Sequence, residues 1–248
     1  MDILKHTQQK FLRKIKNLLK IIDKILIDLK GILFKNKDII SGKELVEYDI
    51  VSRETEKILY DLKKLRRINN IYYVWDYNNE FKKLIFSYKY KRKIILSKLI
   101  VKLIKEEFEF IMKNEKIDVV VSVPISKKRM NERGFNQVDE ILNKLNINYI
   151  KLKRIKNTSK MHKLLDEKLR EKNIKGSFYI NKKIDLKNKK ILLVDDIITT
   201  GSTLREIKNS ILNSSNNQKT EIIVFCFVSL HIRLMVLFYI LSLPFFLL

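Results

Sequence analysis

Cysteine, proline and glycine are scarce in this sequence, and the scarcity limits what the protein can be. A single cysteine, Cys226, stands among 248 residues. This excludes an internal disulfide framework and any four-cysteine zinc site. Because Cys226 lies in an apolar run, we interpret it as a core residue. The five glycines and two prolines, with abundant Lys, Asn, Ile and Phe, are typical of an AT-biased coding sequence.

Acidic residues are also few: the chain has 28 Asp and Glu but 52 Lys and Arg, which gives a formal net charge of +24. Such a charge predicts attraction to polyanions, although coding bias is an alternative source of it. Residues 151–190 contain 15 Lys and Arg against 4 Asp and Glu, so nearly half of the excess is local. A local excess indicates a phosphate-binding surface. With 46% hydrophobic residues, the chain has enough apolar side chains for a substantial core.

The N-terminus lacks the uninterrupted apolar segment of a secretory signal, so we expect a cytoplasmic protein. Residues 3–33 place apolar side chains at helical spacing between lysines, which predicts an amphipathic helix. That helix either packs on the body of the protein, which is the ordinary use of such a pattern, or presents a basic surface to lipid or a partner. The uncharged residues 234–248 form either a membrane anchor or a hydrophobic extension. We prefer the extension, because a spanning helix needs about 20 residues.

The middle of the chain alternates between predicted strands and helices. Residues 54–67 have a helical pattern with Ser52 as a candidate cap, residues 72–77 form an aromatic strand, and residues 81–113 are helical with an interruption near 88–93. Short apolar runs at 118–123, 191–194 and 221–228 predict buried strands, and residues 135–145 and 203–212 predict helices between them. This alternation predicts an α/β fold, with a parallel sheet flanked by helices and an N-terminal helical extension.

The sharpest motif follows the strand at 191–194. Asp195 and Asp196 emerge at its carboxyl end, where open α/β sheets bind ligands, and paired carboxylates suit the two hydroxyls of a ribose. A small hydroxyl-rich turn then opens a helix, and its backbone N–H groups favour an anion. The turn consists of Thr199, Thr200, Gly201, Ser202 and Thr203. It lacks the Gly and Lys spacing of a Walker loop, so a phosphate bound here need not belong to ATP.

A second motif spans residues 121–137. A strand ends at Pro124, a basic loop follows, and a helix begins near Gly134. Cations in a loop that leads to a helix N-terminus suit a second phosphate group, although a solvated basic loop would have the same sequence. The basic residues of this segment are Lys127, Lys128, Arg129 and Arg133.

These motifs resemble a known family. Residues 191–203 match the phosphoribosyl pyrophosphate (PRPP) motif of the type I phosphoribosyltransferases at every position, and residues 121–137 resemble the signature of the ComF/GntX family. The resemblance covers about residues 72–228. It continues through a spaced set that consists of Arg154, Thr158, Leu164, Arg170, Asn173, Gly176 and Phe178.

The resemblance implies a role for each motif. Asp195 and Asp196 would bind the ribose, Thr199 to Thr203 the 5′-phosphate, and the loop around Lys127 to Arg133 the pyrophosphate, while residues 155–172 would form a mobile hood. Mg²⁺ would arrive with the pyrophosphate. Two departures are visible: residues 34–70 lack the cysteines of a zinc ribbon, and Met161 stands where the family has glutamine.

Two functions follow from this resemblance. The first is a PRPP- or ribose 5-phosphate-binding protein of DNA uptake in competence, with single-stranded DNA and the competence machinery as partners. The second is an active transferase that moves phosphoribose to a base or amine acceptor. Residues 88–93 interleave rings and charges as a DNA-binding surface would, or as a helix with buried tyrosines would. We predict a helical region at 1–70, a phosphoribosyltransferase-like domain at 71–230 and a hydrophobic tail at 231–248, with membrane contact through the tail as the less favoured option.

Overall fold

The computed structural model describes residues 15–16, 18–25, 37–45, 50–155, 175–179, 184–199, 201–213 and 219–229. The chain divides into two compact units, residues 1–58 and 59–248. Three predicted features therefore lie wholly or largely outside the described residues: most of the helix at 3–33, the hood at 155–172, and the tail at 231–248. Among the described residues, no helix is long and apolar enough to cross a membrane.

The first unit is organised around a buried carboxylate, Asp38. Its oxygens accept hydrogen bonds from the backbone N–H groups of Ile40, Ser41 and Ser52 at 2.7, 3.0 and 2.8 Å. The Ser52 hydroxyl donates to the same carboxylate at 2.9 Å and also accepts from the Thr55 N–H at 3.1 Å. Ser52 therefore caps α2 (Arg53–Asp61), as predicted. Residues 39–41 form a turn.

The second unit is built on a six-stranded sheet with the order β1-β2-β8-β7-β3-β4. The strands are β1 (Arg66–Ile68), β2 (Ile71–Asp76), β3 (Val119–Ser122), β4 (Tyr149–Lys151), β7 (Lys190–Ile198) and β8 (Glu221–Ser229). Only the β1–β2 pair is antiparallel, and the other neighbours are parallel. The predicted α/β class is confirmed. A separate pair, β5 (Lys153–Arg154) and β6 (Phe178–Tyr179), is antiparallel.

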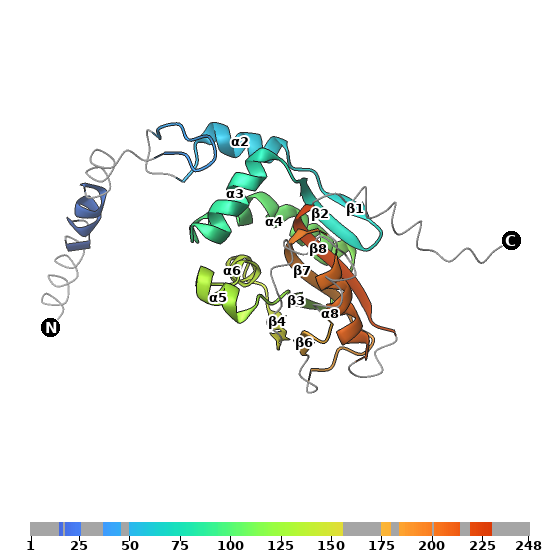
Figure 1. Ribbon diagram of the computed structural model, residues 1–248. Coiled ribbons are helices and arrows are strands. Elements are labelled where there is room, and N and C mark those ends of the chain that lie inside the picture. Colours follow the sequence, from blue (N-terminus) through green and yellow to red (C-terminus); the bar gives the residue numbers. More distant parts are fainter. Residues whose placement is uncertain are drawn as a thin grey trace, which may run out of the picture. The chain divides into compact units, whose positions relative to one another are not determined.

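Helices cover both faces of the sheet (Figure 1). They are α3 (Asn79–Tyr90), α4 (Leu96–Asn114), α5 (Lys127–Arg133), α6 (Gln137–Lys144) and α8 (Ser202–Asn213). On one face, Leu204 and Ile207 of α8 share an apolar cluster with Leu193 of β7. On the other face, Phe108 of α4 packs edge-on against Phe225 of β8, with ring centroids 5.7 Å apart. A central strand buried on both faces explains the unbroken apolar run of β7.

Three local predictions were wrong. The predicted helix at 54–67 ends at Asp61, and β1 begins at Arg66. The signal for β1 was the turn at Asn69 and Asn70: Asn69 has φ +53°, a left-handed conformation that asparagine tolerates in tight hairpins.

The predicted basic loop is a helix, α5, because the Ser126 hydroxyl caps it through the Arg129 N–H and Gly134 ends it. Strand β7 also does not end before the acids but continues to Ile198.

Candidate functional site

The site begins where β7 loses one of its two neighbours. Strand β3 pairs with β7 only as far as Val194, which accepts a 3.0 Å hydrogen bond from the Val123 N–H. Strand β8 continues alongside, up to the pair Ile198 and Ser229. Asp195 and the residues after it therefore have one flank open at the carboxyl edge of a parallel sheet, where such folds bind ligands.

A concave pocket of about 210 Å³, including the space open to solvent, lies at this edge. Its lining residues are Asp195, Ile197, Ile198, Thr199, Gly201, Ser202, Thr203 and Leu204. Gly201 has φ +69°, and its carbonyl accepts the first hydrogen bond of α8, from the Arg205 N–H at 2.8 Å. Thr200 lies outside the described residues. Asp195 and the described residues of the hydroxyl-rich segment, Thr199 and Gly201 to Thr203, thus line one pocket.

The first turn of α8 contributes positive potential to this pocket. The N–H groups at the start of a helix lack partners within the helix and carry the positive end of its dipole. The first turn of α8 has no acidic side chain that would neutralise this potential. The hydroxyls of Ser202 and Thr203 belong to the same turn. The arrangement suits a phosphate group.

The two acids have different surroundings. Asp196 is 8% exposed, and its Oδ2 lies 2.7 Å from Nζ of Lys89, a buried residue of α3. Asp195 lines the pocket, and its Oδ1 accepts a 2.8 Å hydrogen bond from the Asp196 N–H. Charges taken out of water are stable only when they are paired. Lys89 therefore compensates the charge of Asp196, while Asp195 lines the pocket.

The surroundings of Asp195 also change its pKa. Burial, followed by the negative charge of Asp196, raises the pKa of Asp195 from 3.8 to about 7, and Lys89 and Arg129 act in the opposite direction. A carboxyl with so high a pKa exchanges its proton near neutral pH and can donate as well as accept a hydrogen bond.

Two arginines from different elements lie near Asp195. Burial, followed by the positive charge of Arg129, lowers the pKa of the Arg154 guanidinium to about 10, while Asp195 raises it. Arg154 belongs to β5, and its guanidinium lies 5.4 Å from the centre of the Phe178 ring. Two neighbouring like charges are stabilised by an anion between them. The cations around Asp195 are thus suited to a second anionic group.

The other predicted basic residues have different environments. Lys127 and Lys128 are exposed on α5. Arg133 is 6% exposed, donates a 2.7 Å hydrogen bond to Oε1 of Gln137, and lies 5.2 Å from the centre of the Tyr90 ring. None of the three is among the residues that line the described pocket. Their assignment to pyrophosphate stays a prediction.

Sequence reasoning missed Lys89 as a site residue. The sequence pattern groups Lys89 with neighbouring rings as a candidate DNA surface, yet it is buried, as is Tyr88, whose hydroxyl donates to the Gln137 carbonyl at 3.0 Å. The interpretation of residues 88–93 as a helix with a buried tyrosine is confirmed at Tyr88. No local pattern could have paired Lys89 with Asp196, because the two are distant in the sequence.

Comparison with known proteins places this geometry in a family. Residues 90–233, more than half of the chain, match the phosphoribosyl transferase domain. The chain belongs to this family. Within it, the chain is similar to competence proteins of the ComF type, which confirms the predicted resemblance.

Three curated relatives illustrate the similarity. Competence protein ComFC of Streptococcus pneumoniae is 30% identical over 136 residues, which are 54% of this chain and 58% of that protein. DNA utilization protein YhgH of Escherichia coli K12 is 32% identical over 103 residues, 39% and 44% of the two chains. Competence protein F of Haemophilus influenzae is 37% identical over 98 residues, 36% and 42%. The chain thus spans less than two thirds of the length of each of these relatives.

Solved structures of adenine phosphoribosyltransferases are also similar. The enzyme from Saccharomyces cerevisiae, complexed with an imino-altritol bisphosphate and adenine, is 14% identical, with a TM-score of 0.39, over 75% of this chain and 92% of that one. The enzyme from Leishmania tarentolae is 14% identical, with a TM-score of 0.39, over 67% and 94%.

Proposed function

We propose that this protein binds phosphoribosyl pyrophosphate or a related ribose 5-phosphate compound and serves DNA uptake in competence. The proposal rests on one observation: the start of helix α8 and the acids of strand β7 lie at the same edge of the sheet. The start of helix α8 and the Asp195 carboxylate line one pocket, and the Asp196 carboxylate is next to Asp195 in the chain. A sugar phosphate is the ligand that has both a phosphate for the helix start and hydroxyls for a carboxylate. The names of the relatives, which are competence and DNA utilization proteins, support the biological setting.

Each part of the site has a proposed task. The turn from Thr199 to Thr203 and the first N–H groups of α8 bind the 5′-phosphate. Asp195 and Asp196 bind the ribose hydroxyls, with Lys89 as the residue that fixes the Asp196 carboxylate. Arg129 would contact pyrophosphate, with Lys127, Lys128 and Arg133 contributing from the same helix.

Magnesium belongs to this proposal as part of the ligand. Mg²⁺ keeps several waters and is bound largely through phosphate oxygens in such complexes. Among the described residues, no group of three or more His, Cys, Asp or Glu gathers into a metal site. The chemistry that Mg²⁺ would supply is neutralisation of the pyrophosphate charge, and the protein's own contribution is the surrounding cations.

A transferase activity is the second candidate, and the cations near Asp195 favour it. In phosphoribosyl transfer, the bond from the sugar carbon to pyrophosphate breaks and a bond to a nitrogen nucleophile forms. Cations beside the leaving group stabilise the charge that develops on it. Arg129 and Arg154 are candidates for this role, and pyrophosphate release in the presence of candidate bases measures it directly.

The proposal is tested by calorimetry and thermal unfolding with PRPP and Mg²⁺. We expect binding to the wild-type protein and at least a tenfold loss in Asp195→Asn and in Asp196→Asn, because hydrogen bonds to charged groups contribute about 1.5–3 kcal/mol each. Ribose 5-phosphate is expected to bind more tightly than either ribose or inorganic phosphate, since only it engages both halves of the pocket.

The matched control is Asp61→Asn, which removes an exposed carboxylate at the end of α2. Its affinity for PRPP should equal that of the wild type. If PRPP neither released heat nor raised the unfolding temperature of the wild-type protein, the proposed function would be wrong.

A further inference from the structure

The outward face of α3 has an unusual composition. Six of the twelve residues of this helix are buried, but Phe86 and Tyr90 are 52% and 60% exposed. They stand four residues apart, so they are neighbours on one helix face, and their ring centroids are 5.2 Å apart at an angle of 39°. Burying such rings is ordinarily favourable, so two adjacent exposed rings indicate a surface that receives a partner.

Positive charge surrounds the two rings. Lys82 precedes them on the same face, and Lys91 and Lys93 follow at the end of the helix, all exposed. Within the described part of the chain, none of these three lysines forms an ion pair. The face therefore keeps an uncompensated positive potential, which fits a polyanionic partner.

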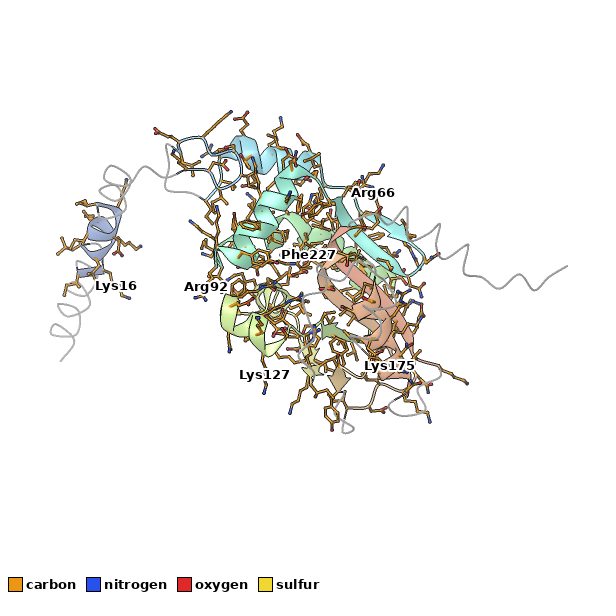
Figure 2. The ribbon with its side chains drawn as sticks, viewed as in Figure 1. Lys16, Arg66, Arg92, Lys127, Lys175 and Phe227 are labelled. Atoms are coloured by element: carbon orange, nitrogen blue, oxygen red, sulfur yellow. The ribbon has the colours of Figure 1, made fainter. Side chains whose placement is uncertain are left out.

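The rings are also held in place. The Arg133 guanidinium lies 5.2 Å from the centre of the Tyr90 ring. Arg92 joins the end of α3 to α5 by donating from Nε to the Glu132 carbonyl at 2.8 Å. Figure 2 labels Arg92 at the end of α3, beside α5. A ring positioned before binding loses less conformational entropy when a base stacks on it.

We propose that the exposed face of α3 and the residues just after the helix bind single-stranded nucleic acid. This surface consists of Lys82, Phe86 and Tyr90 on α3, and of Lys91 and Lys93 after its end. Sequence-tolerant binders of single strands combine cations along the backbone with aromatic rings on which bases stack. Phe86 and Tyr90 lie about 6 Å apart along the helix axis, a spacing that two neighbouring bases of an extended strand can span. A duplex fits less well, because its bases are already stacked on one another.

Helix α3 also connects this surface to the pocket. Tyr90 faces outward, while the adjacent Lys89 pairs with Asp196 on the inward side. This inference extends the proposed function by assigning the nucleic-acid partner to a surface separate from the sugar-phosphate pocket. The two can therefore be tested independently of each other.

The test is fluorescence anisotropy of labelled oligothymidylate with the full chain. Alanine substitution at a base-stacking ring weakens single-strand binding by about tenfold. We expect a loss of at least tenfold in Phe86→Ala and in Tyr90→Ala. The matched control is Phe110→Ala, which removes a ring of similar exposure, 51%, from α4 and should leave affinity unchanged.

The charged residues give a second readout. Each phosphate contact adds about 0.7 to the slope of log affinity against log salt for a single strand. Lys91→Gln and Lys93→Gln should each reduce that slope, while Phe86→Ala should lower the affinity and leave the slope unchanged. This pattern separates stacking from charge.

Three results would overturn the inference: equal affinity of Phe86→Ala and wild type for oligothymidylate, an equal loss in Phe110→Ala, or binding of vesicles with anionic lipid headgroups in preference to the oligonucleotide. Phe86→Ala should retain the thermal stabilisation by PRPP. Failure of the nucleic-acid inference is thereby distinguished from failure of the proposed sugar-phosphate site.

Discussion

At the scale of single residues, Lys89 decides how the paired acids can act. Its side chain is 11% exposed and its ammonium contacts the carboxylate of Asp196, whose side chain is 12% exposed, so neither charge is well solvated. Breaking such a pair leaves a charge in a poorly solvated place, which costs more than the intact pair contributes.

We predict that Lys89→Met lowers the free energy of unfolding by about 3 kcal/mol, because Asp196 is then buried without its partner. Lys82→Met, on the exposed face of the same helix, should have little effect. The double variant Lys89→Met/Asp196→Asn should recover most of the loss, since both charges are gone. Urea unfolding measures all of these, and a double variant less stable than Lys89→Met would contradict the role of the ion pair.

Asp195 predicts a particular dependence of stability on pH. Its pKa in the folded state is raised to about 7 by burial and then by Asp196, so the folded protein takes up a proton more readily than the unfolded chain. Its contribution is therefore fully present below about pH 4 and is lost as the pH rises through about 7. Asp195→Asn should remove this component, so the variant should gain stability relative to wild type as the pH rises from about 4 to about 8. Urea titrations across this range that ran parallel for the two proteins would show the assignment to be wrong.

At the scale of elements, helix α5 positions Arg129 and depends on its two ends. Ser126 caps its start, and Gly134 closes it with φ +84°. A side chain built on Gly134 would meet no described atom within 4 Å, so the glycine is required by backbone conformation and not by space.

We predict that Gly134→Ala destabilises the protein by about 1–2 kcal/mol, the cost of a left-handed conformation for a residue with Cβ. Because the strain lies at the end of α5, it should also weaken PRPP binding. Gly42→Ala is the matched control: Gly42 has φ +76° and open space, but it lies in the first unit. Calorimetry on both variants should show reduced PRPP affinity only for Gly134→Ala.

At the scale of the whole molecule, the chain has two compact units, residues 1–58 and 59–248. The first contains the Asp38 network. Burial alone would raise the pKa of Asp38, but the hydrogen bonds from Thr55, Ser52, Ser41 and Ile40 outweigh burial and place it below its usual value. Asp38 thus stabilises the first unit at neutral pH, and the contribution fades in acid as the carboxylate takes up a proton.

We predict that Asp38→Asn opens residues 37–58 locally at neutral pH, because an amide cannot accept all the hydrogen bonds that the carboxylate receives. Hydrogen exchange should speed up by about tenfold or more in the described part of this segment, while strands β7 and β8 stay protected. Thermal stabilisation by PRPP should persist in the variant. Uniformly faster exchange over both units would contradict their independence.

The sequence determined the parts of this protein that depend on neighbouring residues. The alternation of buried strands and helices, the Ser52 cap, the break between α3 and α4, and the hydroxyl-rich turn after Asp196 could all be predicted, because periodicity and turn chemistry act over a few residues. Short motifs fix local conformation, and this is why residues 191–203 could be interpreted from their order in the chain alone.

Tertiary structure decided which of these residues meet. It paired Lys89 with Asp196, brought Arg154 and Arg129 near Asp195, and turned Phe86 and Tyr90 outward from a helix whose other face is core. Such contacts join segments distant in the sequence, and they form only when apolar burial orients whole elements. Patterns among neighbouring residues do not show how whole elements are oriented. The paired acids could therefore be predicted from sequence, while the pairing of Lys89 with Asp196 could not.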